Sequence, residues 1–371
     1  MALFSRLFKF GERGQIIVIT ALLLPVLAGM TGLALDIGTY SMERRNLQND
    51  ADSIALAAAQ ELPNSGNATA KANEWAANND VSLSQLTVSI EGGTTAPLVR
   101  ATITKNHKFA FLGIFGISDK DVSAKAAAVK VSFGGAAGIV PWTVTQATLD
   151  ASTSGDLMVM KYDALNVDSG NFGAIRIDGP GSNTYNSSVL YGSTTVACAA
   201  TAPNCTTGAC PGQYPAVCSE TSPECDGPEC QPETGNMVGP TRTGVDFRIA
   251  YTSTTCDEFT EAFTPSVGDS YDLNPDCNPW LDGPGKCLTN TSLCSRRVII
   301  IPVVDEFGSG ASDPSTLQRF ALVFLEGYDT DKCQGNACEI KGRFVTAEIS
   351  AKALAGAFDE DAPIHFVRLS E

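Results

Sequence analysis

The twelve cysteines are the residues whose type and spacing point most directly to covalent chemistry. All of them lie between Cys198 and Cys338. An even number of cysteines confined to one part of a chain is typical of disulfides formed in an oxidising compartment. The alternative is a set of buried free thiols in a cytosolic protein. The disulfide candidates are Cys198, Cys205, Cys210, Cys218, Cys225, Cys230, Cys256, Cys277, Cys287, Cys294, Cys333 and Cys338.

Half of these cysteines form an internal repeat. The three cysteines from Cys198 to Cys210 recur, each twenty residues later, between Cys218 and Cys230. Their spacing, without a neighbouring histidine, fits zinc poorly. Each repeat holds three cysteines, an odd number that cannot all pair within one repeat. Disulfides must therefore join the two repeats or reach later cysteines, and the connectivity stays open. Because residues 193–240 carry few large apolar side chains, we predict a Cys-rich insertion in which disulfides replace a core.

A second pattern could bind a metal ion. Asp150, Ser152 and Ser154 stand in a D-x-S-x-S arrangement, which opens the metal site of von Willebrand A domains. One carboxylate and two hydroxyls can hold Mg²⁺ together with water and a partner's carboxylate. That site should follow a buried apolar strand, whereas residues 143–149 are mostly polar. We therefore expect an ordinary turn, no metal and no other cofactor, with these three residues as weak metal candidates.

The remaining sequence offers little for catalysis or nucleic-acid binding. The two histidines, His107 and His365, lie near no nucleophile motif, and no G-x-S-x-G, P-loop or HExxH pattern occurs. Residues 141–371 carry 13 Lys and Arg against 30 Asp and Glu, and such an acidic surface repels phosphate backbones. We expect no enzymatic activity, no small-molecule substrate and no nucleic-acid partner.

An apolar segment near the N-terminus could carry the cysteine-rich part across a membrane. Residues 16–35 include no charge, and twenty helical residues cover a hydrocarbon core of roughly 30 Å. Arg6, Lys9 and Arg13, offset only by Glu12, predict a cytoplasmic N-terminus. A cleaved signal peptide is the alternative, but its apolar region is usually about 7–15 residues long. We predict a retained single-pass anchor in the cell membrane, with the C-terminal domain extracytoplasmic.

One helical stripe continues beyond the apolar segment. Its apolar residues recur at helical spacing, and Pro63 ends the run. Such a helix packs either against other helices or against a sheet of its own chain. The stripe comprises Tyr40, Leu47, Ala51, Ile54, Ala55, Ala58 and Leu62.

Three short motifs frame the apolar segment and carry a family resemblance. They are R-G-Q at 13–15 with Pro25 inside the run, G-L-A-L-D-I-G at 32–38, and R-R-N-L-Q-N-D-A-D at 44–52. In these residues the chain resembles TadE/TadG-like proteins of the Flp (tight adherence) pilus assembly system. The resemblance implies a membrane-anchored assembly component whose partners are pilus assembly proteins or pilins. It implies anchor and helix-packing roles for Gly14, Pro25, Asp36, Tyr40, Leu47, Ala51, Ile54, Ala55 and Ala58.

One position departs from the TadE pattern. TadE-like pseudopilins carry Glu at the fifth position after a processed glycine, and counting from Gly14 that position is Ile19. The carboxylate that would meet a neighbouring subunit's N-terminal amine in a pilin-like filament is therefore missing. The resemblance favours an unprocessed, TadG-like protein and not a repeating filament subunit.

The predicted fold class is α+β: a transmembrane helix continuing into a long amphipathic helix, a small helix-plus-sheet unit, and a β-rich, disulfide-stapled ectodomain. Period-two alternation on either side of Gly92-Gly93 predicts a hairpin, and residues 134–138 predict a linker. The expected parts are a cytoplasmic N-terminus (1–15), a transmembrane helix (16–37), a pilin-like helix and β unit (38–133), and a β-rich extracytoplasmic domain (139–371).

An apolar cluster between Phe109 and Phe115 has two possible roles. Its composition favours the core of the small sheet unit, and a patch on which a partner docks is the alternative. The sequence as a whole predicts a non-enzymatic, membrane-anchored component of Flp/Tad-type pilus assembly that acts through protein–protein contacts. The alternative is a membrane-anchored surface adhesin with a metal site at Asp150.

Overall fold

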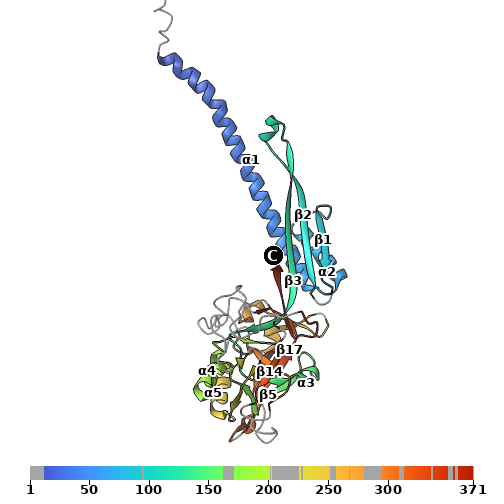
Figure 1. Cartoon of the computed structure of the whole chain (residues 1–371), viewed down its shortest axis with the longest axis vertical. Helices are drawn as coiled ribbons and strands as arrows, with labels where there is room; N and C mark the ends of the chain where they lie inside the picture. The colour runs from blue at the N-terminus through green and yellow to red at the C-terminus, as the bar shows by residue number, and fades with distance from the viewer. Residues whose placement is uncertain are drawn as a thin grey trace, which may run out of the picture. The chain divides into compact units, whose positions relative to one another are not determined.

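The fold is α+β, as predicted, and consists of two compact units (Figure 1). Unit 1 contains residues 1–91, 98–128 and 369–371, and unit 2 contains residues 92–97 and 129–368. The computed structural model describes residues 12–93, 96–161, 171–200, 202, 225–226, 229–250, 256–266, 268–279, 295–308, 313–335, 337–349, 354–355 and 358–370.

Unit 1 begins with a single long helix, α1 (Glu12–Gln60). Its 49 residues span about 74 Å at the usual rise. Pro25 lies inside the helix, and the chain turns at Glu61 and Leu62 just before Pro63. The predicted apolar segment and the predicted amphipathic stripe are therefore two parts of one helix.

A second helix, α2 (Ser65–Asn78), packs on the C-terminal part of α1. The side chain of Asn64 caps it by accepting the N–H of Asn67 at 3.0 Å, a common way of starting a helix. The buried residues of α2 are Ala68, Ala72 and Ala76. Since these alanines recur every four residues, they form one smooth face that allows α2 to approach α1 closely.

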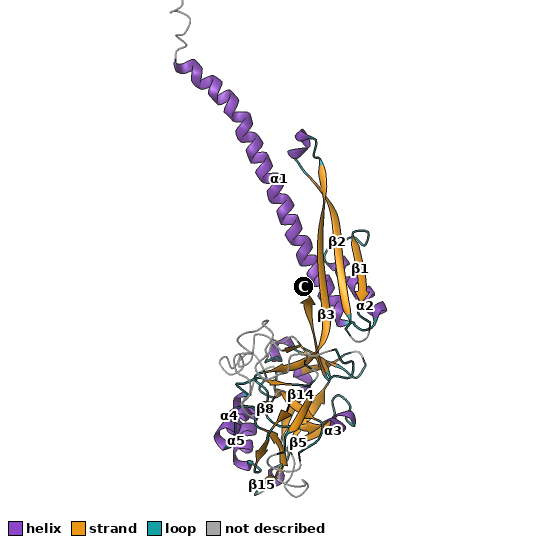
Figure 2. Cartoon of the chain, viewed as in Figure 1, coloured by secondary structure: helices purple, strands orange, loops and turns teal. Residues whose placement is uncertain are grey.

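Three strands complete unit 1: β1 (Leu86–Glu91), β2 (Leu98–Lys108) and β3 (Asp119–Ala136). β1 pairs antiparallel with β2, from Leu86 opposite Ile103 to Glu91 opposite Leu98. β2 is also hydrogen-bonded to β3, and the short 3-10 helix η1 (Leu112–Phe115) connects the two in a long hairpin (Figure 2). Val99, Ala101 and Ile103 alternate along β2 and are buried.

The last eight residues of β3 belong to unit 2. There Gly135 lies opposite Cys198 of β7 (Ala197–Cys198) and opposite Leu354 of β19 (Leu354–Ala355). Residues 134–136, predicted as a linker, are thus strand in the structure. The division between the units, at Ala128 and Val129, lies inside β3.

The central sheet of unit 2 has the strand order β4-β13-β14-β17-β5. All neighbours pair antiparallel except β4 and β13, which are parallel. Its strands are β4 (Val144–Thr145), β13 (Val298–Val304), β14 (Ser315–Gly327), β17 (Ile340–Val345) and β5 (Leu157–Lys161). A second row of hydrogen-bonded strands runs from β3 in the order β20-β18-β12-β11. These strands are β11 (Phe263–Pro265), β12 (Tyr271–Leu273), β18 (Ala347–Glu348) and β20 (Ile364–Ser370).

Short elements surround these strands. The helices are α3 (Gln146–Asp150), α4 (Ser182–Tyr191), α5 (Val238–Ile249), α6 (Phe259–Ala262), η3 (Pro275–Cys277) and η4 (Thr330–Lys332). The short strands are β6 (Asn171–Ile175), β8 (Cys225–Asp226), β9 (Glu229–Cys230), β10 (Pro232–Thr234), β15 (Cys333–Gln334) and β16 (Ala337–Cys338).

The core of unit 2 lies on both faces of β13 and β14. Along β13, Val298 and Ile300 belong to one hydrophobic cluster, whereas Ile299 and Ile301 belong to another. All seven residues of β13 are buried. A strand covered on both faces reads as a continuous apolar run, which is why Val298–Val304 could be predicted as buried from sequence.

Candidate functional site

The N-terminal part of α1 exposes a large apolar surface. Its most apolar 18-residue window has a mean hydropathy of 2.2, and only 6% of that window is buried. The large apolar side chains from Ile17 to Leu35 that face outward are 44–70% exposed. A helix of this length and composition suggests a single-pass membrane protein.

One face of α1 connects this apolar part to the sheet of unit 1. Gly32, Asp36, Tyr40 and Glu43 follow one another at steps of four, four and three, so they lie on the same side of the helix. They contact the hairpin formed by β2, η1 and β3, which extends alongside α1 beyond β1 and α2 (Figure 1). We call this set of contacts the clasp. It comprises Gly32, Asp36, Tyr40 and Glu43 on α1, and Lys105, His107, Phe109 and residues 110–112 on the hairpin.

Asp36 is the centre of the clasp. Its carboxylate accepts three backbone N–H groups, from Ala110 at 2.9 Å, Phe111 at 2.9 Å and Leu112 at 2.6 Å. Only 2% of Asp36 is exposed. Residues 110–112 connect the end of β2 with the start of η1, so their N–H groups do not take part in the pairing of the strands. Hydrogen bonds to a carboxylate are roughly twice as strong as neutral ones, so Asp36 holds the end of the hairpin on α1.

Gly32 provides the space for the hairpin next to Asp36. A Cβ atom at this position would lie 2.6 Å from Cγ of Phe111 and 2.9 Å from its Cβ. Both distances are shorter than carbon atoms tolerate, so only glycine admits this approach. At Gly29 and Gly38 on the same helix, a Cβ would meet no atom of the described residues within 4 Å.

We expect Gly32→Leu to push Phe111 off α1 and to destabilise unit 1 by about 1–3 kcal/mol, the usual cost of overpacking. Thermal unfolding of the full chain in detergent measures the effect. Gly29→Leu is the matched control, because it adds the same side chain to the same helix in open space. Equal unfolding temperatures for the two variants would contradict the role of Gly32.

Aromatic rings continue the clasp one turn further along α1. Tyr40 stacks on Phe109 with ring centroids 5.9 Å apart and meets the edge of His107 at 5.7 Å. The Nζ atom of Lys120 lies 6.0 Å from the centre of the Tyr40 ring. These contacts join α1 to both strands of the hairpin.

Glu43 closes the clasp with two charged contacts. Its carboxylate lies 2.8 Å from Nζ of Lys105 and also contacts Nδ1 of His107. The hydrogen bond to Lys105, followed by that to His107, lowers the pKa of the Glu43 carboxyl below its ordinary value. Both contacts favour the charged carboxylate, so Glu43 links the helix to β2 most strongly when it is ionised.

Glu43→Gln is expected to reduce the stability of unit 1 by about 1 kcal/mol at neutral pH. Because the pKa of Glu43 is lower in the folded state, its contribution is complete above the unfolded pKa of about 4.3 and is lost as pH falls through the folded value. The difference in unfolding temperature between wild type and variant should therefore be constant near neutral pH and shrink only as the pH falls below about 4.3. Glu61→Gln, at the end of α1 and outside the clasp, is the control. A pH-independent difference would contradict the assignment.

The predicted stripe continues the same face of α1 beyond the clasp, into the core of unit 1. Leu47, Ala51, Ile54, Ala55 and Ala58 are all buried, and α1 contacts α2 and β2 there. Pro25 lies on the exposed apolar part of α1, and Gly14 is described only by its place in the α1 backbone. Of the predicted anchor and packing residues, the structure thus brings Asp36 and Tyr40 together with the hairpin and buries the later five in unit 1.

The disulfides predicted from the cysteine count are confirmed where the structure describes them. Cys256 pairs with Cys277, and Cys333 pairs with Cys338. Cys198 and Cys230 are each disulfide-bonded as well. Cys225 is described only by its backbone, in β8 opposite Cys230. The remaining candidates lie outside the described residues: Cys205, Cys210, Cys218, Cys287 and Cys294.

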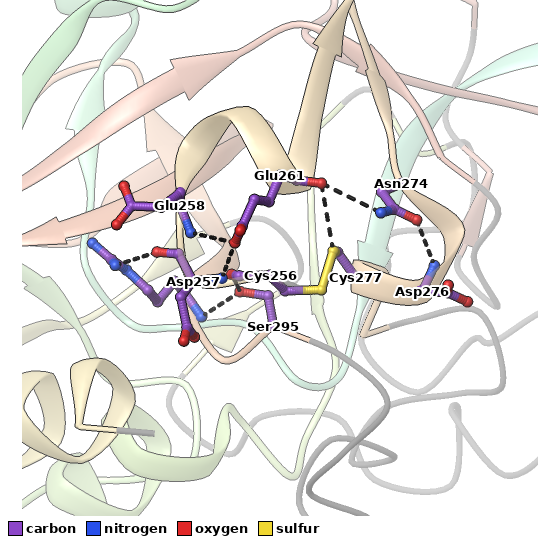
Figure 3. Close-up of a disulfide and its surroundings, with 9 residues drawn as sticks. Cys256, Asp257, Glu258, Glu261, Asn274, Asp276, Cys277 and Ser295 are labelled. Atoms are coloured by element: carbon purple, nitrogen blue, oxygen red, sulfur yellow. Dashed lines mark hydrogen bonds between the residues drawn. A yellow bond between two sulfur atoms is a disulfide. The ribbon is translucent and has the colours of Figure 1, made fainter. Parts of the chain in front are cut away.

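The Cys256–Cys277 disulfide connects the start of α6 with η3 (Figure 3). Both cysteines belong to a buried hydrophobic cluster of unit 2. Glu261 accepts the N–H of Asp257 and of Glu258 through its side chain, at 3.0 and 3.1 Å. Its backbone oxygen accepts the side-chain amide of Asn274 at 3.3 Å. The disulfide therefore closes a segment that hydrogen bonds already shape.

Cys256→Ser is expected to lower the stability of unit 2 by about 3 kcal/mol, because the bond closes a loop with a sequence separation of 21. Cys333→Ser should cost less, about 2 kcal/mol, since its loop has a separation of only 5. Thermal unfolding without reductant compares the two. A larger loss for Cys333→Ser would contradict the loop-length argument.

The weak metal candidates lie in a hydrogen-bonded turn. Asp150 accepts the side-chain amide of Gln146, Ser152 donates to the backbone oxygen of Thr148 at 2.8 Å, and Ser154 accepts the N–H of Thr346 at 2.8 Å. Both serine hydroxyls thus have backbone partners within the chain. Among the described residues, no group of three or more His, Cys, Asp or Glu side chains is placed to hold a metal ion.

One carboxylate that organises unit 2, Asp178, carries no signal in the sequence. Asp178 accepts Ser188 Oγ at 2.7 Å and the backbone N–H groups of Thr194 and Thr195 at 2.9 Å each. Burial raises the pKa of Asp178, but the hydrogen bonds from Ser188, Thr195 and Thr194 outweigh burial and lower it overall. A lone aspartate in a loop offers no sequence signal for this role.

These observations define a class of protein: a helix with an exposed apolar first part, attached through the clasp to a small sheet unit and followed by a disulfide-bonded, sheet-rich unit. Residues 14–61 match the family described as putative Flp pilus-assembly TadE/G-like, so the chain carries a TadE/G-like segment. The match covers the apolar part of α1 and every α1 residue of the clasp. Comparison of the chain with curated proteins and with solved structures found no match.

Proposed function

We propose that this protein is a membrane-anchored, non-enzymatic component of Flp-type pilus assembly that acts through protein–protein contacts. The observation that carries the proposal is the TadE/G-like match over residues 14–61, which coincides with the exposed apolar part of α1 and its clasp. Pilus assembly proteins or pilins are the proposed partners. The chemistry required is recognition, because the family to which this segment is similar assembles a pilus and is generally non-enzymatic.

The anchor is proposed to be unprocessed and TadG-like. Ile19 stands where a pseudopilin's glutamate would follow Gly14 at the fifth position, so an N-terminal amine on a neighbouring subunit would find no carboxylate. The polypeptide would then keep its N-terminal residues and remain single-pass. Such a chain serves as a scaffold or minor component and not as the repeating subunit of the filament.

Charge and cysteine chemistry support an orientation with the N-terminus in the cytoplasm. Arg6, Lys9 and Arg13 precede the apolar segment, and positive residues favour the cytoplasmic side. The disulfides of unit 2 favour an oxidising, extracytoplasmic location for that unit. Both arguments give the same orientation in the cell membrane.

The clasp supplies a mechanical reason for this architecture. Asp36 and Glu43 attach the hairpin of unit 1 to α1 directly beyond the apolar segment. A partner bound to the sheet of unit 1 would therefore be held to the anchor through these hydrogen bonds and ion pairs, and not through a flexible linker. This suits a protein that holds partners at a fixed height above a membrane.

In-cell photo-crosslinking tests the proposal. A benzoylphenylalanine is placed at an exposed apolar residue of unit 1, Leu83, or of unit 2, Leu157 or Tyr191. Adducts are recovered through a C-terminal tag and identified by mass spectrometry. A pilin, a platform membrane protein or the assembly ATPase is the expected partner. Recovery of only the protein itself or of cell-wall material would contradict assembly and favour the adhesin alternative.

Substitutions in the stripe cannot replace this experiment. Ala55 is fully buried inside unit 1, so Ala55→Trp would abolish function by overpacking the unit's own core. Asp150→Ala separates the alternatives better, because an adhesin with a metal at Asp150 would lose chelator-sensitive binding. The assembly proposal expects Asp150→Ala to leave crosslinking unchanged.

A further inference from the structure

The end of the hairpin, residues 109–117, is an uninterrupted apolar segment on the surface of unit 1. Its sequence is FAFLGIFGI, without a single polar side chain. Four of its large residues are exposed: Phe111 by 41%, Ile114 by 80%, Phe115 by 75% and Ile117 by 49%. The prediction that this cluster belongs to the core of unit 1 is therefore wrong, because its large side chains face outward. We call residues 109–117 the hairpin tip.

The hairpin tip lies beside the apolar segment of α1. Phe111 sits against Gly32, and Gly32 lies three residues inside the charge-free run that ends at Leu35. At the helical rise, this contact is about 4.5 Å inside the end of the run. The neighbouring outward side chains of α1, Met30 and Leu33, are themselves exposed and apolar.

Seven of the nine backbone N–H groups of the hairpin tip donate to acceptors within unit 1. Asp36 accepts the N–H groups of residues 110–112, and Phe109 donates to the backbone oxygen of Ser118 at 2.9 Å. The N–H groups of Ile114, Gly116 and Ile117 donate to oxygens of Phe111, Gly113 and Leu112. Backbone enters an apolar medium at low cost only when its donors are paired, so the pairing of these seven groups favours insertion.

Charged and amphipathic residues begin where the hairpin tip ends. Lys108 precedes it on β2, while Asp119 and Lys120 follow it on β3, and all three are exposed. Tyr40 stacks on Phe109 and lies under Lys120 at the same level of α1. Tyrosine beside lysine is typical of the boundary between membrane and water.

We propose that the hairpin tip inserts into the lipid leaflet on the side of unit 1, as a second membrane contact beside α1. The occupant of this apolar surface is the lipid bilayer at the depth where headgroups meet acyl chains. Interfacial segments enter bilayers by about 5–10 Å, close to the depth of about 4.5 Å at which Gly32 lies. A second membrane contact beside α1 restricts tilting of unit 1 relative to the membrane plane. The inference rests on the proposed membrane anchoring of α1.

Tryptophan quenching in vesicles tests the insertion. The full chain is reconstituted in phosphatidylcholine and phosphatidylglycerol vesicles that contain lipids brominated at carbons 6 and 7 or at carbons 11 and 12. Phe115→Trp places a probe on the hairpin tip, and Ile114→Trp is a second variant should the first fail to fold. Because the wild-type chain has three tryptophans of its own, its emission is subtracted from that of each variant. Leu83→Trp, exposed on unit 1 away from the hairpin tip, is the matched control, and Leu27→Trp reports on the apolar segment.

The expected result is that the added emission of Phe115→Trp is quenched at least twofold more by the shallow bromines than by the deep ones. Leu83→Trp should instead be quenched by aqueous iodide. Iodide quenching of Phe115→Trp and Ile114→Trp, with Leu27→Trp quenched by deep bromines, would overturn the insertion and leave the anchoring intact. Shielding from both quenchers would indicate a protein neighbour, such as a second copy, and overturn it as well. If Leu27→Trp escapes bromine quenching, the anchoring itself is wrong, and the insertion with it.

Discussion

Replacing Asp36 with alanine is expected to release the hairpin tip from α1. Three backbone N–H groups, of residues 110–112, lose their acceptor in this variant. Each hydrogen bond to a charged group contributes about 1.5–3 kcal/mol, so opening of this segment should become at least about 100-fold more frequent. Hydrogen exchange by mass spectrometry on the full chain in lipid nanodiscs measures the effect in peptides that cover residues 109–118.

Two variants separate the role of Asp36 from a general effect of removing charge. Asp36→Asn keeps one side-chain oxygen as an acceptor and should give an intermediate exchange rate. Asp52→Ala removes a carboxylate from α1 outside the clasp and should leave residues 109–118 as slow as in wild type. Slow exchange of the hairpin tip in Asp36→Ala would show that the tip is held by other contacts.

The parts of this fold that follow local periodicity could be predicted from the sequence. Helical spacing from Tyr40 to Leu62 predicted the buried face of α1, because each residue's side of a helix depends only on its position in the chain. The apolar run Val298–Val304 predicted a buried strand for a similar reason. The cysteine count predicted disulfides, but it could not predict that Cys256 pairs with Cys277, since pairing depends on the folded path.

The clasp could not be predicted, because its partners are far apart in the chain. Asp36 belongs to a motif of the resembling family, yet the N–H groups it accepts lie 74 to 76 residues later. Gly32 is one of several glycines in α1, and only the approach of Phe111 distinguishes it from Gly29. The apolar composition of residues 109–117 favours a core position, whereas the structure exposes most of them. Long-range placement decides all three cases.

Asp178→Ala should destabilise unit 2 by about 4 kcal/mol, more than the loss of either described disulfide. Asp178 connects the segment before α4 with α4 and with the segment after it, by accepting Ser188 Oγ in the helix and Thr195 Oγ1 and two backbone N–H groups beyond it. Thr195 is buried, so water cannot readily replace the acceptor that its N–H loses. The hydroxyls of Ser188 and Thr195 keep only the backbone oxygens of Thr184 and Ile177 as acceptors. Thermal unfolding of the full chain in detergent gives the difference.

The pH dependence of that difference identifies the carboxylate as its source. The pKa of Asp178 is lowered in the folded state, so its contribution is complete above the unfolded pKa of about 3.9 and is lost as pH falls through the folded value. Wild type and Asp178→Ala should therefore differ by a constant amount from about pH 5 to pH 8 and converge only in stronger acid. Asp150→Ala, which removes an exposed carboxylate of the same unit, should stay within about 0.5 kcal/mol of wild type throughout. Convergence already near pH 6, or an equal loss in Asp150→Ala, would mean that Asp178 stabilises unit 2 by some other means.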